Sequence, residues 1–196
     1  AGVRAPGARS AGTGASGATG SGAIPAGAIA NEPAVLRDGV GQRAAEAATR
    51  GARLRDVSYR VTVDLADLAE HERFHTSTEI TFTCDGTGPV WLDLVADRVI
   101  SVRHNGTELD AESVCGPERV LVPRPDRRNT VHVTSVHRSG TAAAGLCRTV
   151  DVTDGAVYAW TQFQPFDARR MFACFDQPDV RARTTISVIA QEGWTC

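Results

Sequence analysis

The chain has 196 residues, of which 42% are hydrophobic and 22% are charged, and its formal net charge at pH 7 is −2. This composition is typical of a folded globular protein, and the length suits one domain with some additional residues. The slight negative charge excludes the basic surface of a nucleic-acid-binding protein and the polybasic patch of a membrane-surface protein. We therefore expect neither nucleic acid nor membrane as a partner.

The five cysteines stand at wide, irregular spacings and form no C-x-x-C pair. An odd number without a pairing pattern indicates neither a disulfide framework nor a zinc ribbon. We expect buried or half-buried free thiols and a cytoplasmic location. No stretch approaches the roughly 18 apolar residues of a membrane span, and the N-terminus lacks the pattern of a secretory signal. The cysteines are Cys84, Cys115, Cys147, Cys174 and Cys196.

The first part of the chain divides into a tail and a helix. Residues 1–30 are rich in Gly, Ala, Ser and Thr, cannot bury much apolar surface, and predict a disordered tail or linker. Asn31 is a suitable N-cap, and Glu32 and Pro33 suit the first helical turn. We expect a short lead-in helix within residues 31–53.

From residue 54 to residue 196 the hydrophobic period changes to two, which is typical of strands with one buried face. Residues 57–65 and 74–84 alternate most regularly. Asn105 and Gly106 supply the two positive φ angles of a tight hairpin turn. The sequence thus predicts an all-β domain, a saddle-like β-sandwich of short, mostly antiparallel strands. The further strands are expected at residues 90–94, 99–104, 120–122, 130–136, 156–164 and 184–190.

The run His71 to His75 matches H-E-x-x-H, the signature of a zinc peptidase. The signature requires a helix, because only a helical turn brings both histidines to one face beside the metal. Phe74 begins a period-two strand here, and residues four apart on an extended chain lie roughly 13 Å apart. We interpret the run as a polar connection between strands, and we expect no metal ligand in this chain.

The most informative segment spans residues 158–179. Extended geometry would place Tyr158, Trp160, Gln162 and Gln164 on one side of a strand. Two aromatic and two amide side chains on one face fit a core edge with satisfied amides. They fit the wall of a ligand pocket equally well, and the residues alone leave both alternatives open.

A family resemblance favours the second alternative. The run TQFQPFDARRMFACFDQPDVRA, residues 161–182, resembles the signature at the end of the N-terminal domain of the aminopeptidase N family, the zinc aminopeptidases that carry G-A-M-E-N and H-E-x-x-H motifs. The runs DVSYRVTVDL, FHTSTEITF, VWLDLVADRVISVRHNG, GLCRTVDVTDGAVYAWTQ and ISVIAQEGW are similar to its strands in the same order. The resemblance covers roughly residues 35–196 and is closest to bacterial members. Cys147 departs from it, standing where members commonly carry His or an aromatic residue.

The resemblance implies a domain that covers one side of the active site of a peptidase. By position, Gln162 and Gln164 would help bind the free α-amine of the peptide substrate. Zn²⁺ and the catalytic groups would belong to a downstream catalytic domain, the chain's main partner besides the peptide N-terminus. Neither G-A-M-E-N nor a helical H-E-x-x-H is present here. We therefore expect a piece of a metallopeptidase that performs no hydrolysis alone.

The remaining conspicuous residues are expected to be structural. We expect Asp167, Arg169 and Arg170 to form ion pairs, residues 176–179 to form a turn, and Phe172 and Phe175 to anchor the core or a domain interface. Two other hypotheses remain: a stand-alone β-domain acting as a binding or regulatory subunit, and, ranked last, a zinc site built on the H-E-x-x-H run.

Overall fold

The computed structural model of the chain describes residues 3–5, 44–141 and 143–195. Strands dominate these residues, and the helices are short. In chain order the elements are β1 (Val3–Ala5), α2 (Ala44–Arg53), β2 (Leu54–Asp64), α3 (Leu68–His71), β3 (Arg73–Cys84), β4 (Val90–Asp93), β5 (Arg98–His104), β6 (Thr107–Leu109), α4 (Ala111–Val114), β7 (Arg119–Val122), β8 (Arg128–Arg138), β9 (Gly145–Val150), β10 (Val157–Gln162), the 3-10 helix η1 (Ala168–Arg170) and β11 (Arg183–Ile189).

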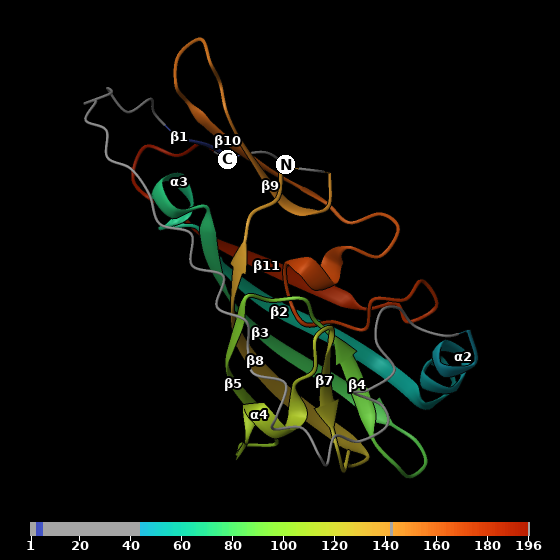
Figure 1. Cartoon of the computed structure of the whole chain (residues 1–196). Helices are drawn as coiled ribbons and strands as arrows, with labels where there is room; N and C mark the ends of the chain where they lie inside the picture. The colour runs from blue at the N-terminus through green and yellow to red at the C-terminus, as the bar shows by residue number, and fades with distance from the viewer. Residues whose placement is uncertain (1–2, 6–43, 142, 196) are drawn as a thin grey trace.

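The largest sheet has six strands in the order β11-β2-β3-β8-β5-β6. All neighbours are antiparallel except β11, which runs parallel to β2. The long central strands alternate between buried and more exposed residues, as the period of two predicts. One face of this sheet is therefore the core, and Figure 1 shows the sheet crossing the middle of the molecule.

Two smaller sheets complete the domain, the pair β4-β7 and the three-stranded β1-β10-β9. In Figure 1 the first lies near α2 at one end of the molecule, and the second lies at the other end. A single cluster of buried side chains joins all three sheets. Tyr59 and Phe172 meet edge to face at 6.0 Å between ring centroids, and Phe82 and Phe175 do so at 5.2 Å. The predicted anchoring by Phe172 and Phe175 is confirmed.

The opposite face of the large sheet is polar. Arg60, Glu79 and His132 are cross-strand neighbours on β2, β3 and β8. Arg60 Nη1 lies 2.6 Å from Glu79 Oε1, and His132 Nε2 lies 3.5 Å from Glu79 Oε2. Cross-strand pairs of this kind suit a solvated face, so the sheet is amphipathic.

The predicted all-β class and the predicted strands are confirmed, with boundaries that differ by at most three residues. Asn105 and Gly106 have φ angles of 48° and 83°, so the predicted turn between β5 and β6 is confirmed. The sequence analysis missed β6, β9 and the short helices, because segments of three to six residues show little periodicity. Within the described residues, no helix is long and apolar enough to cross a lipid bilayer.

The N-terminal predictions fall partly outside the described residues. The lead-in helix is present as α2, but residues 31–43 of the predicted range lie outside them. Val3–Ala5, within the predicted disordered tail, instead pairs antiparallel with β10. Main-chain pairing at an open sheet edge needs no hydrophobic pattern, and composition therefore could not reveal it. The rest of the predicted tail lies outside the described residues.

Candidate functional site

The two candidate glutamines lie where β10 ends. Gln162 is the last residue of the strand and pairs with Gly145 of β9. Gln164 follows two residues later in the connection to η1 and is exposed. The predicted strand face therefore ends at Gln162, because pairing with β9 stops there. Gln164 is presented by a loop rather than by a strand.

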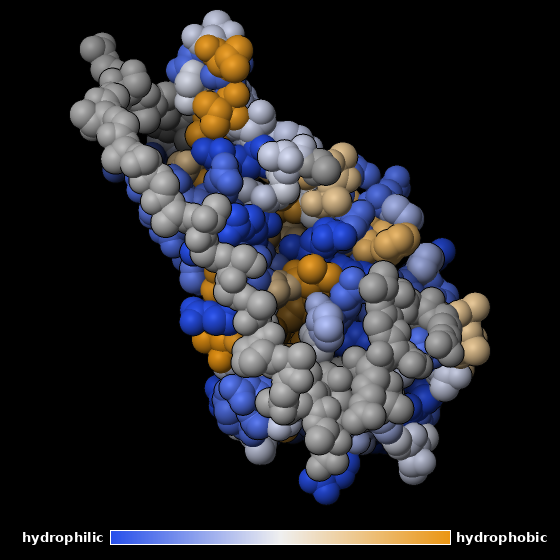
Figure 2. Space-filling view, viewed as in Figure 1, coloured by the Kyte–Doolittle hydropathy of each residue, from blue (hydrophilic) through white to orange (hydrophobic). Residues whose placement is uncertain are grey.

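The alternation of buried and more exposed side chains along β10 agrees with the predicted strand as far as Gln162. Val157 and Ala159 are buried, whereas Tyr158 is half-buried and Trp160 is 36% exposed. The side of β10 that leads to Gln162 is thus the open side of the small sheet. Exposed apolar residues Val150 and Val152 lie at the tip between β9 and β10, where Figure 2 shows apolar side chains at the surface.

The side-chain amides of the two candidate glutamines differ from that of the nearby Gln177. Within the described part of the chain, neither Gln162 nor Gln164 makes a side-chain hydrogen bond. Gln177 shows the contrast: its Oε1 accepts from Arg50 Nε at 2.6 Å, and its Nε2 donates to Ala47 O at 3.0 Å. Gln177 therefore performs a structural role, whereas the amides of Gln162 and Gln164 remain available to a ligand.

The loop that carries Gln164 is held by its own ion pairs. Arg170 Nε lies 2.8 Å from Asp167 Oδ1, and Arg169 Nε lies 3.1 Å from Asp176 Oδ2. Arg169 also places its guanidinium 5.4 Å from the ring centroid of Phe166. The predicted ion pairs of Asp167, Arg169 and Arg170 are confirmed, and they fix the course of the loop.

The segment after η1 is attached to the core by main-chain contacts. Asp93 and Cys174 exchange main-chain hydrogen bonds at 2.7 and 3.0 Å. The Tyr59 hydroxyl accepts from the Phe175 N–H at 2.9 Å. Val180 N donates to Gln177 O at 3.2 Å, which closes the predicted turn. These contacts make residues 163–180 a firmly placed support for Gln164.

Sequence reasoning missed the residue that ties these parts together. Arg50 of α2 is 1% exposed and donates to Asp93 Oδ2 at 2.7 Å and to Trp91 O at 3.1 Å. Nothing in the alanine-rich sequence around Arg50 distinguishes it from a surface arginine. Only the fold shows that its guanidinium is buried.

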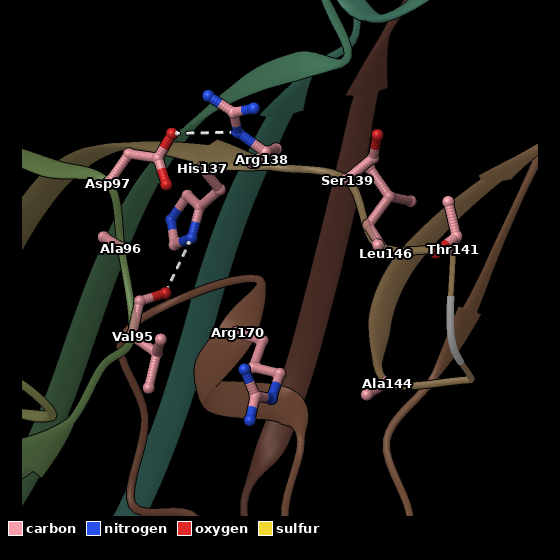
Figure 3. A pocket seen from close by; sticks show the side chains of 11 residues that line it. Val95, Ala96, Asp97, His137, Arg138, Ser139, Thr141, Ala144, Leu146 and Arg170 are labelled. Carbon is pink, nitrogen blue, oxygen red and sulfur yellow. Dashed lines mark hydrogen bonds and ion pairs between the residues drawn. The ribbon is translucent and has the colours of Figure 1, made fainter. Parts of the chain in front are cut away.

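A cavity of about 530 Å³ lies beside the loop, between the end of β8, the β4–β5 connection and Arg170. Figure 3 shows His137 directed at the Val95 carbonyl and Arg138 directed at Asp97. Neither Gln162 nor Gln164 lines this cavity. The cavity and the predicted site are therefore separate features.

The one histidine that lines the cavity has a structural role. His137 Nδ1 lies 3.1 Å from the Val95 carbonyl oxygen, so Nδ1 carries the proton and donates it. Its Nε2 then accepts from the Ser135 hydroxyl at 2.8 Å, and the Thr76 hydroxyl lies 3.1 Å from the same nitrogen and 3.0 Å from the Ser135 oxygen. Burial lowers the pKa of His137 to about 4, and it is neutral at physiological pH. Both ring nitrogens are engaged, which makes His137 structural.

The H-E-x-x-H run does not form the helix that a zinc site requires. His71 is the last residue of α3, Glu72 adopts a left-handed conformation, and His75 lies in β3. The connection predicted between two strands is thus confirmed, with one helical turn inside it. Among the described residues, no three His, Cys, Asp or Glu side chains lie together as a metal site would require.

The described cysteines are free and poorly suited to nucleophilic chemistry. Burial raises the pKa of the Cys174 thiol well above its usual value, and it raises that of Cys115 to about 11. Cys84 and Cys147 are buried as well. Since the thiolate is the nucleophile, the raised pKa values leave the Cys115 and Cys174 thiols unreactive at neutral pH. The expected free thiols are confirmed for these four residues, and Cys196 lies outside the described residues.

Comparison with known proteins assigns this arrangement to a family. The model of the peptidase M1 N-terminal domain family matches residues 56–195. The chain belongs to the peptidase M1 N-terminal domain family. This M1 N-terminal domain is 36% identical over 159 residues to aminopeptidase N of Streptomyces lividans, covering 80% of the chain and 19% of that relative. It therefore spans about a fifth of the relative's length, and the resemblance to the aminopeptidase N family is confirmed.

Solved structures show the same fold at lower identity. An aminopeptidase A of Legionella pneumophila, in complex with aspartic acid, matches with a TM-score of 0.58 and 17% identity over 78% of this M1 domain and 17% of that chain. A yeast LTA4 hydrolase matches with a TM-score of 0.57 and 18% identity over 71% of the domain and 23% of that chain. An M1 zinc metallopeptidase of Deinococcus radiodurans matches with a TM-score of 0.53 and 19% identity over 70% of the domain and 32% of that chain.

Proposed function

We propose that this chain is the substrate-facing N-terminal domain of a zinc-dependent aminopeptidase, in which a catalytic domain follows in the full-length protein. Family membership and the likeness to an aminopeptidase N support the reaction class. The observation that carries the more specific role is that the amides of Gln162 and Gln164 make no side-chain hydrogen bond to any residue that the structure describes. The domain would cover one side of the active site and recognise the substrate there.

The chemistry of a peptide N-terminus suits these amides. The α-ammonium group is a donor, and each glutamine offers a carbonyl oxygen as acceptor without adding a charge. A hydrogen bond to a charged group contributes about 1.5–3 kcal/mol. Gln164 is the better candidate of the two, because it lies on the exposed loop whereas Gln162 is half-buried in the ladder with β9.

Zinc does not fit the described residues of this chain. They contain no group of three metal-ligating side chains, and His71 and His75 are held on different elements. Burial raises the pKa values of the Cys115 and Cys174 thiols, which disfavours the thiolate that a metal would bind. We therefore assign the zinc ion and the hydrolytic chemistry to the downstream catalytic domain. We also assign the protein to the cytoplasm, because the described cysteines are free thiols.

The experiment compares the full-length protein with the 196-residue chain for bound zinc and for hydrolysis of aminoacyl substrates. We expect zinc and chelator-sensitive activity in the full-length protein and neither in the chain alone. His71→Ala should leave the zinc content of the full-length protein unchanged. Stoichiometric zinc on the isolated chain that is lost in His71→Ala would overturn the assignment, as would a full-length protein without peptidase activity.

A further inference from the structure

Phe166 is a large apolar side chain that stays outside the core. It is 56% exposed and lies outside the cluster of buried side chains that joins the sheets. The nearby Phe163 behaves differently, since its ring packs edge to face on Phe172 with 6.1 Å between the centroids. A single exposed phenylalanine is common on protein surfaces. The position of Phe166 is informative, because it follows Gln164 by two residues.

Gln164 and Phe166 are presented by the same turn. Asp167 N donates to Phe163 O at 2.8 Å, which closes the turn. Gln164, Pro165 and Phe166 lie between these two ends, and all three are exposed. Two residue steps span at most about 7 Å, so the Cα atoms of Gln164 and Phe166 lie no farther apart than that. An amide and an apolar ring are therefore close neighbours at the surface.

The Phe166 ring is held in place by Arg169. The Arg169 guanidinium carbon lies over one face of the ring, 5.4 Å from its centroid. The Arg169 Nε–H group is shared between the Phe166 carbonyl oxygen and Asp176 Oδ2, each at 3.1 Å. Arg169 is only 8% exposed, so this support is itself part of the interior. An aromatic ring that is exposed but already fixed loses little side-chain entropy on contact, which is a property of binding anchors.

We propose that Phe166 is a specificity-determining residue that contacts the side chain of the substrate's N-terminal residue and favours an apolar side chain there. This inference rests on the proposed function, in which Gln164 binds the α-amine. The carbon atom that bears the α-amine also bears the side chain of the same residue. An amine held at Gln164 therefore brings that side chain within reach of the ring. The ring has no hydrogen-bonding group, so the contact it offers is burial of apolar surface.

A packed interface with the catalytic domain is the competing use of the ring. Such an interface would also cover the Gln164 amide, which makes no hydrogen bond within the described residues. Burying an amide without a partner is unfavourable. The end of a peptide supplies both an ammonium group for the amide and a side chain for the ring. A polar and an apolar group on one turn therefore fit a peptide end better than a packed interface.

The kcat/KM values of the full-length protein for leucyl and alanyl substrates with the same leaving group test the proposal. In Phe166→Ala the preference for the leucyl substrate should fall by at least about fivefold, because the larger side chain loses its apolar contact. Phe166→Leu keeps an apolar side chain and should retain most of the preference. Val152→Ala is the control, since it removes an exposed apolar side chain at the β9–β10 tip and should change nothing. An unchanged preference in Phe166→Ala would overturn the proposal.

Two other results would also overturn it. Equal losses for both substrates, together with a lower unfolding midpoint of the full-length Phe166→Ala variant, would assign the ring to a domain interface. A change of preference that appears only at the second residue of a peptide would place the ring against a different side chain. In the 196-residue chain Phe166→Ala should unfold close to the wild-type temperature, because the ring lies outside the core.

Gln164→Ala separates this inference from the proposed function. Loss of the amine contact should lower kcat/KM for the leucyl and alanyl substrates by the same factor, whereas Phe166→Ala should lower the two values unequally. An active full-length protein whose Phe166→Ala variant keeps its preference contradicts only the specificity role. A full-length protein without peptidase activity contradicts the proposed function, and the specificity role is then overturned with it.

Discussion

The Arg50 guanidinium and the Asp93 carboxylate form an ion pair at 2.7 Å, with side-chain exposures of 0% and 2%. Asp93 Oδ2 also accepts the main-chain N–H of Asp176 at 2.9 Å. The pair therefore joins α2, β4 and the segment after η1. Because that segment supports the loop of Gln164, the lead-in helix belongs to the structural framework of the candidate site.

Replacing Arg50 by alanine should destabilise the domain strongly. The substitution would leave the Asp93 carboxylate buried without its cation, which typically costs about 3–5 kcal/mol in the free energy of unfolding. Denaturant unfolding of the 196-residue chain measures this loss. Arg60→Ala is the matched control, since Arg60 forms an equally short pair with Glu79 but its side chain is 77% exposed. It should cost less than about 1 kcal/mol. Similar losses in the two variants would show that the Arg50–Asp93 pair is not the buried tie described above.

His137 should make the stability of the domain fall in mild acid. Its pKa is lowered to about 4 in the folded protein from the ordinary histidine value of 6.5, because burial disfavours the imidazolium. Between these two values the unfolded chain takes up a proton that the folded protein does not. Stability is therefore complete above about pH 6.5 and decreases as the pH falls towards 4, by up to about 3 kcal/mol.

The measurement for His137 is the free energy of unfolding at several pH values, for the wild type and for His137→Gln. The variant should be less stable at neutral pH, because three hydrogen-bond partners of the ring are disturbed. Between pH 6.5 and pH 4, the free energy of unfolding should also fall less in the variant than in the wild type. His132→Gln, on the solvent-facing side of the same strand, should retain the wild-type decrease. An unchanged pH profile in His137→Gln would contradict a buried neutral imidazole.

Gly145→Ala should perturb the support of the candidate site directly. Gly145 has a φ of 75°, and an added Cβ would lie 2.8 Å from Arg170 Cβ. Strain of this kind typically costs about 1–3 kcal/mol, and the clash would also displace η1. Gly88→Ala is the control, because its φ is 90° but a Cβ there meets nothing within 4 Å. Thermal unfolding should show a larger loss for Gly145→Ala, and equal losses would rule out the contact with Arg170 as the cause.

The fold was predictable from sequence where one physical signal dominates. The alternation of Val57, Tyr59, Val61 and Val63 predicts a strand with one buried face, and all four side chains are buried. Asn105 and Gly106 predict their turn, because few other residue pairs adopt two positive φ angles easily. The same reasoning excluded the H-E-x-x-H helix, since the period-two pattern begins at Phe74.

The remaining features depend on contacts between distant parts of the chain. Arg50 and Asp93 are 43 residues apart, and no local pattern shows that both side chains become buried together. Gln162 and Gln164 were identified by position through a family resemblance, and physics alone left their role open. Only the structure showed that their side chains form no hydrogen bond within the described residues. The sequence also did not reveal that all seven residues of β11 are exposed, because it is typical of an ordinary buried strand.

Recognition of the substrate amine by Gln164 is the central claim, and kcat/KM of the full-length protein for an aminoacyl substrate tests it most directly. Gln164→Ala should lower kcat/KM roughly ten- to a hundredfold, the loss expected for one hydrogen bond to a charged group. Gln164→Glu keeps an acceptor and should retain activity, and a substrate analogue without the α-amine should not distinguish Gln164→Ala from the wild type. An unchanged kcat/KM in a correctly folded Gln164→Ala variant would contradict the account.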